Sequence, residues 1–204
     1  PDALDLVSAR STWSCESRWG TRPLRGSQGI PAYSDWKHDG QTSREVIRGV
    51  GRSSWSTDGD LPFALVTNRE NGRSLGWEVE NNGPWTWEVI AQRDVGLTFS
   101  VALLGPTDLD HSWCKVLAPG AEFTTVAASV FCSDGGVDGI AGEATRHRRA
   151  SQHPQVDPNR AGVIFNDYMN TLMGDPTTEK LLPLIDAAAD LGAETFCIDA
   201  GWYD

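Results

Sequence analysis

Cysteine is scarce in this 204-residue chain, and the four that occur stand far apart, at Cys15, Cys114, Cys132 and Cys197. None forms the closely spaced pair from which structural zinc sites are built, and the four histidines are scattered, so the sequence predicts no metal site. Nothing in the spacing favours a disulfide framework either. We therefore expect a protein of a reducing compartment, the cytoplasm, with Cys197 as a small buried side chain.

Long apolar runs and a basic surface are also missing. No stretch is long enough to span a bilayer, so no membrane partner is expected. The formal charge of −11 argues against a nucleic-acid partner, whose binding surface would be basic. The one basic cluster, residues 146–149, is expected to be a solvated or interdomain face. The chain begins Pro1-Asp2-Ala3 without an initiator Met, which we interpret as the start of a piece cut from a longer protein.

Tryptophan, by contrast, is abundant, because the chain has nine. Exposed tryptophans serve as platforms in sugar-binding proteins, whereas in a β-sandwich they fill the core. We expect most of the nine to lie in the core, and Trp202 and those in loops to lie outside it.

Residues 1–155 have the character of β-structure. Alternation of apolar and polar residues, with some less regular apolar runs, predicts strands at 63–67, 75–79, 85–89, 95–103 and 123–131. The turn cluster at 81–84 predicts that two of these strands form a hairpin with their tryptophans on one face. No helix is expected before residue 140. The sequence thus predicts a large N-terminal β-sandwich domain over 1–155.

A change of composition follows this region. Residues 150–160 are polar and contain proline, as linkers do, and an apolar strand is expected at 161–165. A helix starting near 175–179, with Pro183 inside it and Gly192 ending it, then leads to a strand at 194–199. We expect the regular helix to be kinked at the proline or to start late.

This strand–helix–strand order is typical of two fold classes, the dinucleotide-binding fold and the (β/α)8 barrel. A dinucleotide-binding fold would need a glycine-rich turn after its first strand, and 166–176 contains one glycine. The fold class expected is therefore mainly β: the β-sandwich followed, over 156–204, by the first β-α-β unit of a truncated (β/α)8 TIM barrel.

The last residues combine acids and aromatics directly after the final expected strand. Asp199 closes that strand and Trp202 follows, where parallel α/β sheets place ligand-contacting groups. An aromatic face beside a carboxylate suits a sugar, whose C–H surface stacks and whose hydroxyls donate. A strand end with a polar cap and a buried tryptophan would leave the same pattern, so both interpretations stay open on the residues alone.

Six short motifs follow one another along the chain, within a likeness that runs from about Trp13 to the end. They are Arg52-Ser53-Ser54, Pro62-Phe63-Ala64-Leu65, Leu-Ala-Pro-Gly-Ala-Glu-Phe at 117–123, Phe165-Asn166-Asp167-Tyr168, Leu191-Gly192-Ala193-Glu194 and Asp-Ala-Gly-Trp-Tyr at 199–203. This series resembles the bacterial α-galactosidases of glycoside hydrolase family 36.

The resemblance implies a β-sandwich, a catalytic (β/α)8 barrel and a smaller C-terminal β-domain, in a homo-oligomer when full-length. It implies a retaining hydrolase of α-linked galactosides or oligosaccharides that uses no metal or organic cofactor. Both catalytic aspartates would lie beyond residue 204, so no catalytic residue is expected in this segment. The implied substrate-binding residues are Asp199, Trp202, Tyr168 and Asn166.

Two positions depart from the family pattern. Ala200 stands where the family has a second acid, and Tyr168 stands where it has a tryptophan. A lost carboxylate removes a charge-assisted hydrogen bond worth ~1.5–3 kcal/mol, so an N-acetylgalactosaminide or a pentopyranoside is an alternative substrate. A non-catalytic carbohydrate-binding β-domain is the other alternative. Residues 160–204 favour the enzyme, because a binding module has no need of a barrel unit.

Overall fold

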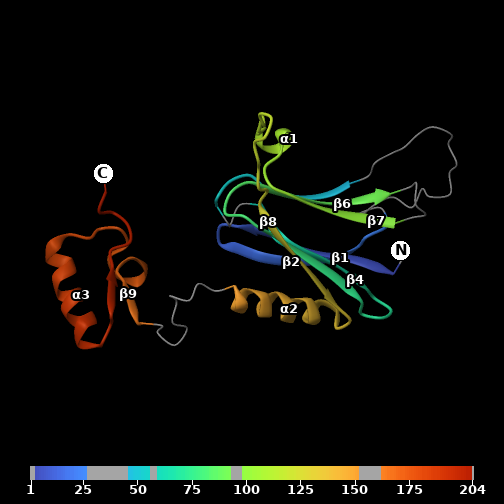
Figure 1. Ribbon diagram of the computed structural model, residues 1–204. Coiled ribbons are helices and arrows are strands. Elements are labelled where there is room, and N and C mark those ends of the chain that lie inside the picture. Colours follow the sequence, from blue (N-terminus) through green and yellow to red (C-terminus); the bar gives the residue numbers. More distant parts are fainter. Residues whose placement is uncertain (1–2, 27–45, 56–58, 93–97, 152–161, 204) are drawn as a thin grey trace. The chain divides into compact units, whose positions relative to one another are not determined.

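The computed structural model describes residues 3–26, 46–55, 59–92, 98–151 and 162–203. The chain divides into two compact units, Pro1–Ala150 and Ser151–Asp204 (Figure 1). Strands make up most of the regular secondary structure in the described residues, so the mainly β character predicted from the sequence is confirmed.

Two antiparallel sheets build the first unit. One has the strand order β2 (Cys15–Pro23), β1 (Leu4–Thr12), β4 (Gly59–Asn68), β5 (Ser74–Glu80) and β8 (Ala127–Ser133). The other has the order β3 (Val46–Gly51), β6 (Trp85–Gln92) and β7 (Thr98–Leu104). Predicted strands at 63–67, 75–79 and 85–89 lie inside β4, β5 and β6, and 98–103 lies inside β7, whereas 95–97 lie outside the described residues. The strand predicted at 123–131 begins only at Ala127, and β1, β2 and β3 were not predicted.

The core between the two sheets contains three tryptophans, Trp77, Trp85 and Trp87. The prediction that most of the nine lie in the core is wrong, because Trp13, Trp19, Trp55, Trp113 and Trp202 are exposed, and Trp36 lies outside the described residues. Trp77 on β5 and Trp87 on β6 are almost fully buried and meet edge to face, with ring centroids 5.7 Å apart. Gly49 and Gly51 on β3 leave room for large rings on β6, because a Cβ at Gly49 would lie 2.2 Å from Trp87 Cε2. The rest of this cluster is aliphatic: Leu6, Leu24, Ile47, Ala64, Val79 and Val89, with Trp85.

The hairpin predicted from 75–79 and 85–89 is wrong. β5 pairs with β4 and β8, whereas β6 pairs with β3 and β7, so the short connection at 81–84 crosses from one sheet to the other. Asn81 Nδ2 donates to Pro84 O at 2.7 Å across this connection. The alternation of a strand shows which face is buried but not which strand lies beside it. The tryptophans of β5 and β6 therefore face each other across the core.

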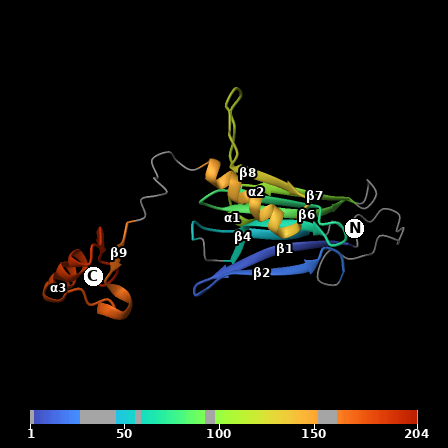
Figure 2. The ribbon, with the colours of Figure 1, turned by 90° about the horizontal axis from the view of Figure 1, so that it is seen from below.

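A helix that the sequence did not predict, α2 (Gly136–Ala150), covers the outer face of the five-stranded sheet (Figure 2). Ile140 and Ala144 pack there against Val7, Leu65 and Phe131. The expectation of β-structure throughout 1–155, with no helix before 140, is therefore wrong. The four-residue helix α1 (Asp108–His111) also falls within 1–155. α2 escaped notice because only two of its side chains are buried apolar groups.

The basic cluster at 146–149 lies on the last turns of α2. His147 Nε2 is 2.7 Å from Glu80 Oε1, and Arg148 donates to Glu78 Oε1 at 2.8 Å. The cluster is thus partly solvated, as expected, and also paired with two acids of β5.

The second unit contains two short parallel strands and a helix. β9 (Ile164–Asn166) and β10 (Thr195–Cys197) pair in parallel, and the rings of Phe165 and Phe196 stack with centroids 5.2 Å apart. Between them lie the irregular turn η2 (Tyr168–Leu172) and the helix α3 (Thr178–Asp190). α3 begins at Thr178, within the start predicted at 175–179, and continues through Pro183, so the late start is not seen. Gly192 follows it with φ +82°, the left-handed conformation predicted for that glycine.

Candidate functional site

The loops after β9 and β10 are joined by one buried acid, Asp167. Its N–H donates to Cys197 O at 3.2 Å, and its Oδ1 accepts the N–H of Asp199 at 2.9 Å. The side chain is 1% exposed. Its other oxygen, Oδ2, is also buried, and no donor within the described part of the chain reaches it. Asp167 therefore holds the two strand ends together and sets the position of Asp199.

Asn166 and Asp199 lie side by side across these strand ends. Asn166 Nδ2 donates to Asp199 Oδ2 at 2.7 Å, while Asn166 Oδ1 accepts the N–H of Tyr168 at 2.9 Å. The second bond fixes which way the amide points. Both side chains are exposed, and among the described residues none donates to Asp199 Oδ1. That oxygen is therefore open to a hydroxyl donor from solution.

Trp202 lies beside this pair. Its Nε1 donates to Asp199 O at 3.0 Å, yet the residue is 66% exposed. The loop needs glycine before it, since Gly201 has φ +87° and a Cβ there would lie 1.9 Å from Gly174 O. The indole is thus held at its polar edge and meets the ring of Tyr203 edge to face at 5.1 Å between centroids, while much of its apolar surface stays exposed.

The structure brings three of the four predicted residues into one hydrogen-bonded group: Asn166, Asp199 and Trp202. Tyr168 is joined only through its backbone N–H to Asn166, and its half-buried ring lies against the turn at Gly174. Ala200, in place of the family's second acid, is half-buried. Cys197, predicted to be buried, is half-buried, with Sγ 3.8 Å from Asn166 Nδ2.

Asp167 was not among the predicted site residues. The signal that could have found it is its place directly after a strand, within the motif at 165–168. An acid there is as well placed as Asp199 to contact a ligand, but the fold turns it inward. Because it is buried, its carboxylate is unsuited to attack a sugar. The arrangement therefore offers one open carboxylate, an oriented amide and an aromatic face, which is a set for binding a polyol.

No group of His, Cys, Asp and Glu side chains suited to a metal ion occurs within the described ranges. None of the helices in those ranges is long and apolar enough to cross a membrane.

Comparison with known proteins relates the chain to one class of enzyme. It is 27% identical to Alpha-galactosidase 2 of Hypocrea jecorina over 187 residues, which is 83% of this chain and 23% of that protein. It is 31% identical to Alpha-galactosidase Mel36A of Lactobacillus acidophilus over 148 residues, 70% of this chain and 19% of that protein. The chain thus spans about a fifth to a quarter of the length of these relatives. No protein-family profile matches it.

Solved structures share the fold along the whole chain. The family 36 α-galactosidase AgaB of Geobacillus stearothermophilus matches with a TM-score of 0.75 and 20% identity, covering 100% of this chain and 25% of that one. AgaA of the same organism, in a variant bound to stachyose, matches with a TM-score of 0.74 and 19% identity, covering 100% and 26%. The chain is a relative of the glycoside hydrolase family 36 α-galactosidases and aligns with the N-terminal quarter of their structures.

Proposed function

We propose that this chain is the N-terminal part of a retaining α-galactosidase-like glycoside hydrolase that acts on α-linked galactosides. In this proposal the first unit is the β-sandwich domain, and β9, α3 and β10 begin the catalytic (β/α)8 barrel. The observation that carries it is the group formed by Asn166, Asp199 and Trp202 at the carboxyl ends of two parallel strands. Ligand-contacting loops occupy that edge in barrels.

Asp199 is the centre of the proposed sugar contact. Its Oδ1 accepts one or two substrate hydroxyls, while Asn166 holds Oδ2 in place. Trp202 provides the apolar face against which the C–H surface of the ring stacks. Asp199 acts as a binding group and not as nucleophile or acid, because a retaining hydrolase needs two carboxylates about 5–5.5 Å apart across the anomeric carbon. The only other acid in this group, Asp167, is buried.

The substrate class rests on the relatives. AgaA variants were crystallised with stachyose and with raffinose. Ala200 and Tyr168 favour a second candidate, an α-glycosidase of the same family for an N-acetylgalactosaminide or a pentopyranoside. The methyl group of Ala200 is neutral. It places no charge beside the acetamido group of an N-acetylgalactosaminide, or beside the position where a pentopyranoside lacks the hydroxymethyl group.

The experiment is a comparison of kcat/KM for aryl α-galactoside, aryl N-acetyl-α-galactosaminide and aryl α-pentopyranoside with the full-length enzyme. The 204-residue chain, assayed beside it, is expected to be inert. A preference for the galactoside supports the first candidate, and a preference for either other glycoside supports the second. Sugar binding by the full-length protein without hydrolysis of any of the three would show a binding module instead. Turnover by the 204-residue chain would contradict the assignment of the catalytic carboxylates to the rest of the enzyme.

A further inference from the structure

A cavity of about 440 Å³ lies in the first unit beside the edge formed by β1 and β2. Its volume falls in the range of small-molecule sites. Charge sets it apart, because four of its nine lining residues are arginines and only one is an acid. The lining residues are Ser8, Arg10, Arg18, Gly20, Thr21, Arg22, Arg48, Asp60 and Trp87.

Strand register places three of these arginines on a single face of the sheet. Leu6 of β1 points into the core between the sheets, and on β2 its partner is Arg22. Further along the same two strands, Arg10 pairs with Arg18. The arginines therefore lie on the same face of the five-stranded sheet as the apolar side chains that form the core between the two sheets.

Among the described residues, the second sheet does not extend over this part of the face. Its edge strand β3 meets β4, where the N–H of Val50 donates to Asp60 Oδ2 at 3.1 Å. β2, at the margin of the five-stranded sheet (Figure 2), is exposed from Cys15 to Thr21. The arginines thus line a recess that water and small solutes can enter.

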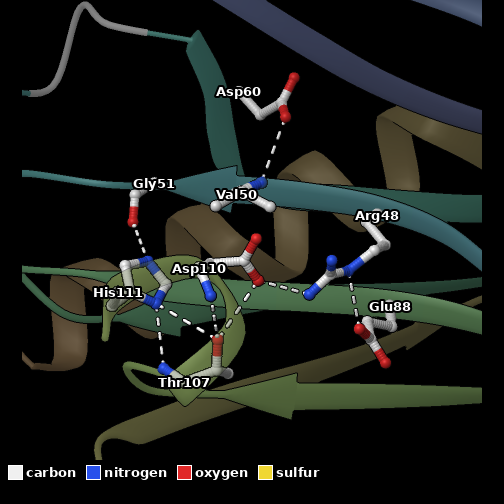
Figure 3. A network of polar contacts seen from close by, with 8 residues as sticks. All are labelled: Arg48, Val50, Gly51, Asp60, Glu88, Thr107, Asp110 and His111. Atoms are coloured by element: carbon white, nitrogen blue, oxygen red, sulfur yellow. Dashed lines mark hydrogen bonds and ion pairs between the residues drawn. The ribbon is translucent and has the colours of Figure 1, made fainter. Parts of the chain in front are cut away.

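One arginine of the recess is already neutralised, as Figure 3 shows. Arg48 Nε lies 2.8 Å from Glu88 Oε1, and its guanidinium also pairs with Asp110 of α1. α1 is fastened to β3 by His111, whose Nδ1 accepts the N–H of Thr107 and whose Nε2 therefore donates to Gly51 O at 2.9 Å.

The other arginines are poorly paired. Arg10 Nε is 3.9 Å from Asp60 Oδ1, the far limit of an ion pair. Within the part of the chain that the structure describes, Arg18 donates only to two neutral oxygens, Cys15 O and Thr12 Oγ1. Arg22 has no partner among the described residues, and its Nε is buried. A buried donor without an acceptor is costly, so the recess is prepared for an anion that would supply one.

We propose that this recess binds a small multiply charged oxyanion of the phosphate type, either free phosphate or the phosphate group of an ester. The planar guanidinium offers paired N–H donors that match phosphate oxygens, and Arg10, Arg18 and Arg22 provide three such groups. The hydroxyl of Ser8, which lies on the same face of the sheet as Arg10, adds a neutral donor. This site belongs to the first unit and is independent of the proposed sugar contact at Asp199.

The test is isothermal titration of the 204-residue chain with inorganic phosphate, a hexose 6-phosphate and the parent hexose, at constant ionic strength in chloride. We expect saturable binding of phosphate and no binding of the hexose at these residues. Tighter binding of the ester identifies an organic phosphate as the ligand, whereas equal binding identifies the free ion.

The variants Arg22→Gln and Arg18→Gln keep the length of the side chain and remove its charge, and each is expected to weaken phosphate binding at least tenfold. Arg73→Gln is the matched control, because Arg73 is strongly exposed elsewhere on the unit, 3.7 Å from Asp134, and its loss should leave binding unchanged. Circular dichroism checks folding. If Arg22→Gln fails to fold, the exposed Arg18→Gln decides alone. Absence of saturable phosphate binding, or equal weakening by Arg73→Gln, would overturn the proposal.

Discussion

Replacing Gly49 with alanine is expected to destabilise the first unit by about 1–3 kcal/mol. Gly49 on β3 lies opposite Trp87 on β6, and a Cβ at this position would be 2.2 Å from the indole Cε2. A shift of the ring would cost the contacts that hold it. Trp87 is 2% exposed, its ring meets that of Trp77 in an edge-to-face arrangement, and its Nε1 donates to Leu61 O at 3.1 Å.

The magnitude follows from three contributions. Overpacking a core by one methyl group costs about 1–3 kcal/mol. Displacing the ring also loses the hydrogen bond to Leu61, worth about 1 kcal/mol. Against these, alanine is favoured over glycine within a strand by about 0.5–1 kcal/mol, because the unfolded chain has less freedom to lose.

The assay is urea denaturation of the 204-residue chain, followed by circular dichroism. Gly142→Ala is the control: Gly142 lies in α2 with nothing within 4 Å of a new Cβ, so this change should stabilise by about 1 kcal/mol. Adding Trp87→Phe to Gly49→Ala should make the double variant more stable than the sum of the two losses predicts, by about 1 kcal/mol, because the smaller ring makes room. Additive losses, or a Gly49→Ala variant as stable as the control, would refute this account of the core.

Three further outcomes are expected. Ile140→Ala should lower the free energy of unfolding by about 2–5 kcal/mol in the same urea assay, because Ile140 is fully buried between α2 and the sheet; a loss below about 1 kcal/mol would contradict that packing. The hydrogen bonds from Ser129 and His147 hold the pKa of Glu80 below its ordinary value of 4.5. Its ionised form therefore stabilises the fold above that value, and this contribution is lost as the pH falls through the lowered pKa. Glu80→Gln should accordingly destabilise at neutral pH and have no effect in acid, and a loss that persists in acid would contradict the assignment. Finally, amide hydrogen exchange in the 204-residue chain should be fast across 164–166 and 195–197, because so much apolar surface of this unit is uncovered, and strong uniform protection there would contradict this.

Several strands of the first unit could be predicted from alternation alone. β5, β6 and the described part of β7 fell where apolar and polar residues alternate, because a half-buried strand has a period of two. Their partners could not be predicted, since β5 and β6 would show the same pattern as a hairpin or in opposite sheets. α2 was missed for a related reason. Its long polar face pairs with acids of β5, and its contribution to the core is confined to Ile140 and Ala144.

Part of the candidate site could likewise be predicted from the sequence, and part could not. That Asn166 and Asp199 lie together follows from the sequence, because both come at the carboxyl ends of neighbouring parallel strands. Which acid turns inward does not. Asp167 and Asp199 each follow a strand, and the fold buries the first and exposes the second. The arginine recess was also invisible in the sequence, because its members are brought together by the pairing of β1 with β2.

The most direct test of the proposed function is the Asp199→Asn substitution in the full-length enzyme. Asparagine keeps the shape of the side chain and an oxygen for Asn166, but loses the charge that substrate hydroxyls would meet. We expect kcat/KM for the aryl α-galactoside to fall by roughly ten- to a hundred-and-fiftyfold, the equivalent of ~1.5–3 kcal/mol of transition-state stabilisation, with the melting temperature unchanged. Unchanged kcat/KM together with a lowered melting temperature would show that Asp199 is a structural cap of the strand and not a sugar-binding residue.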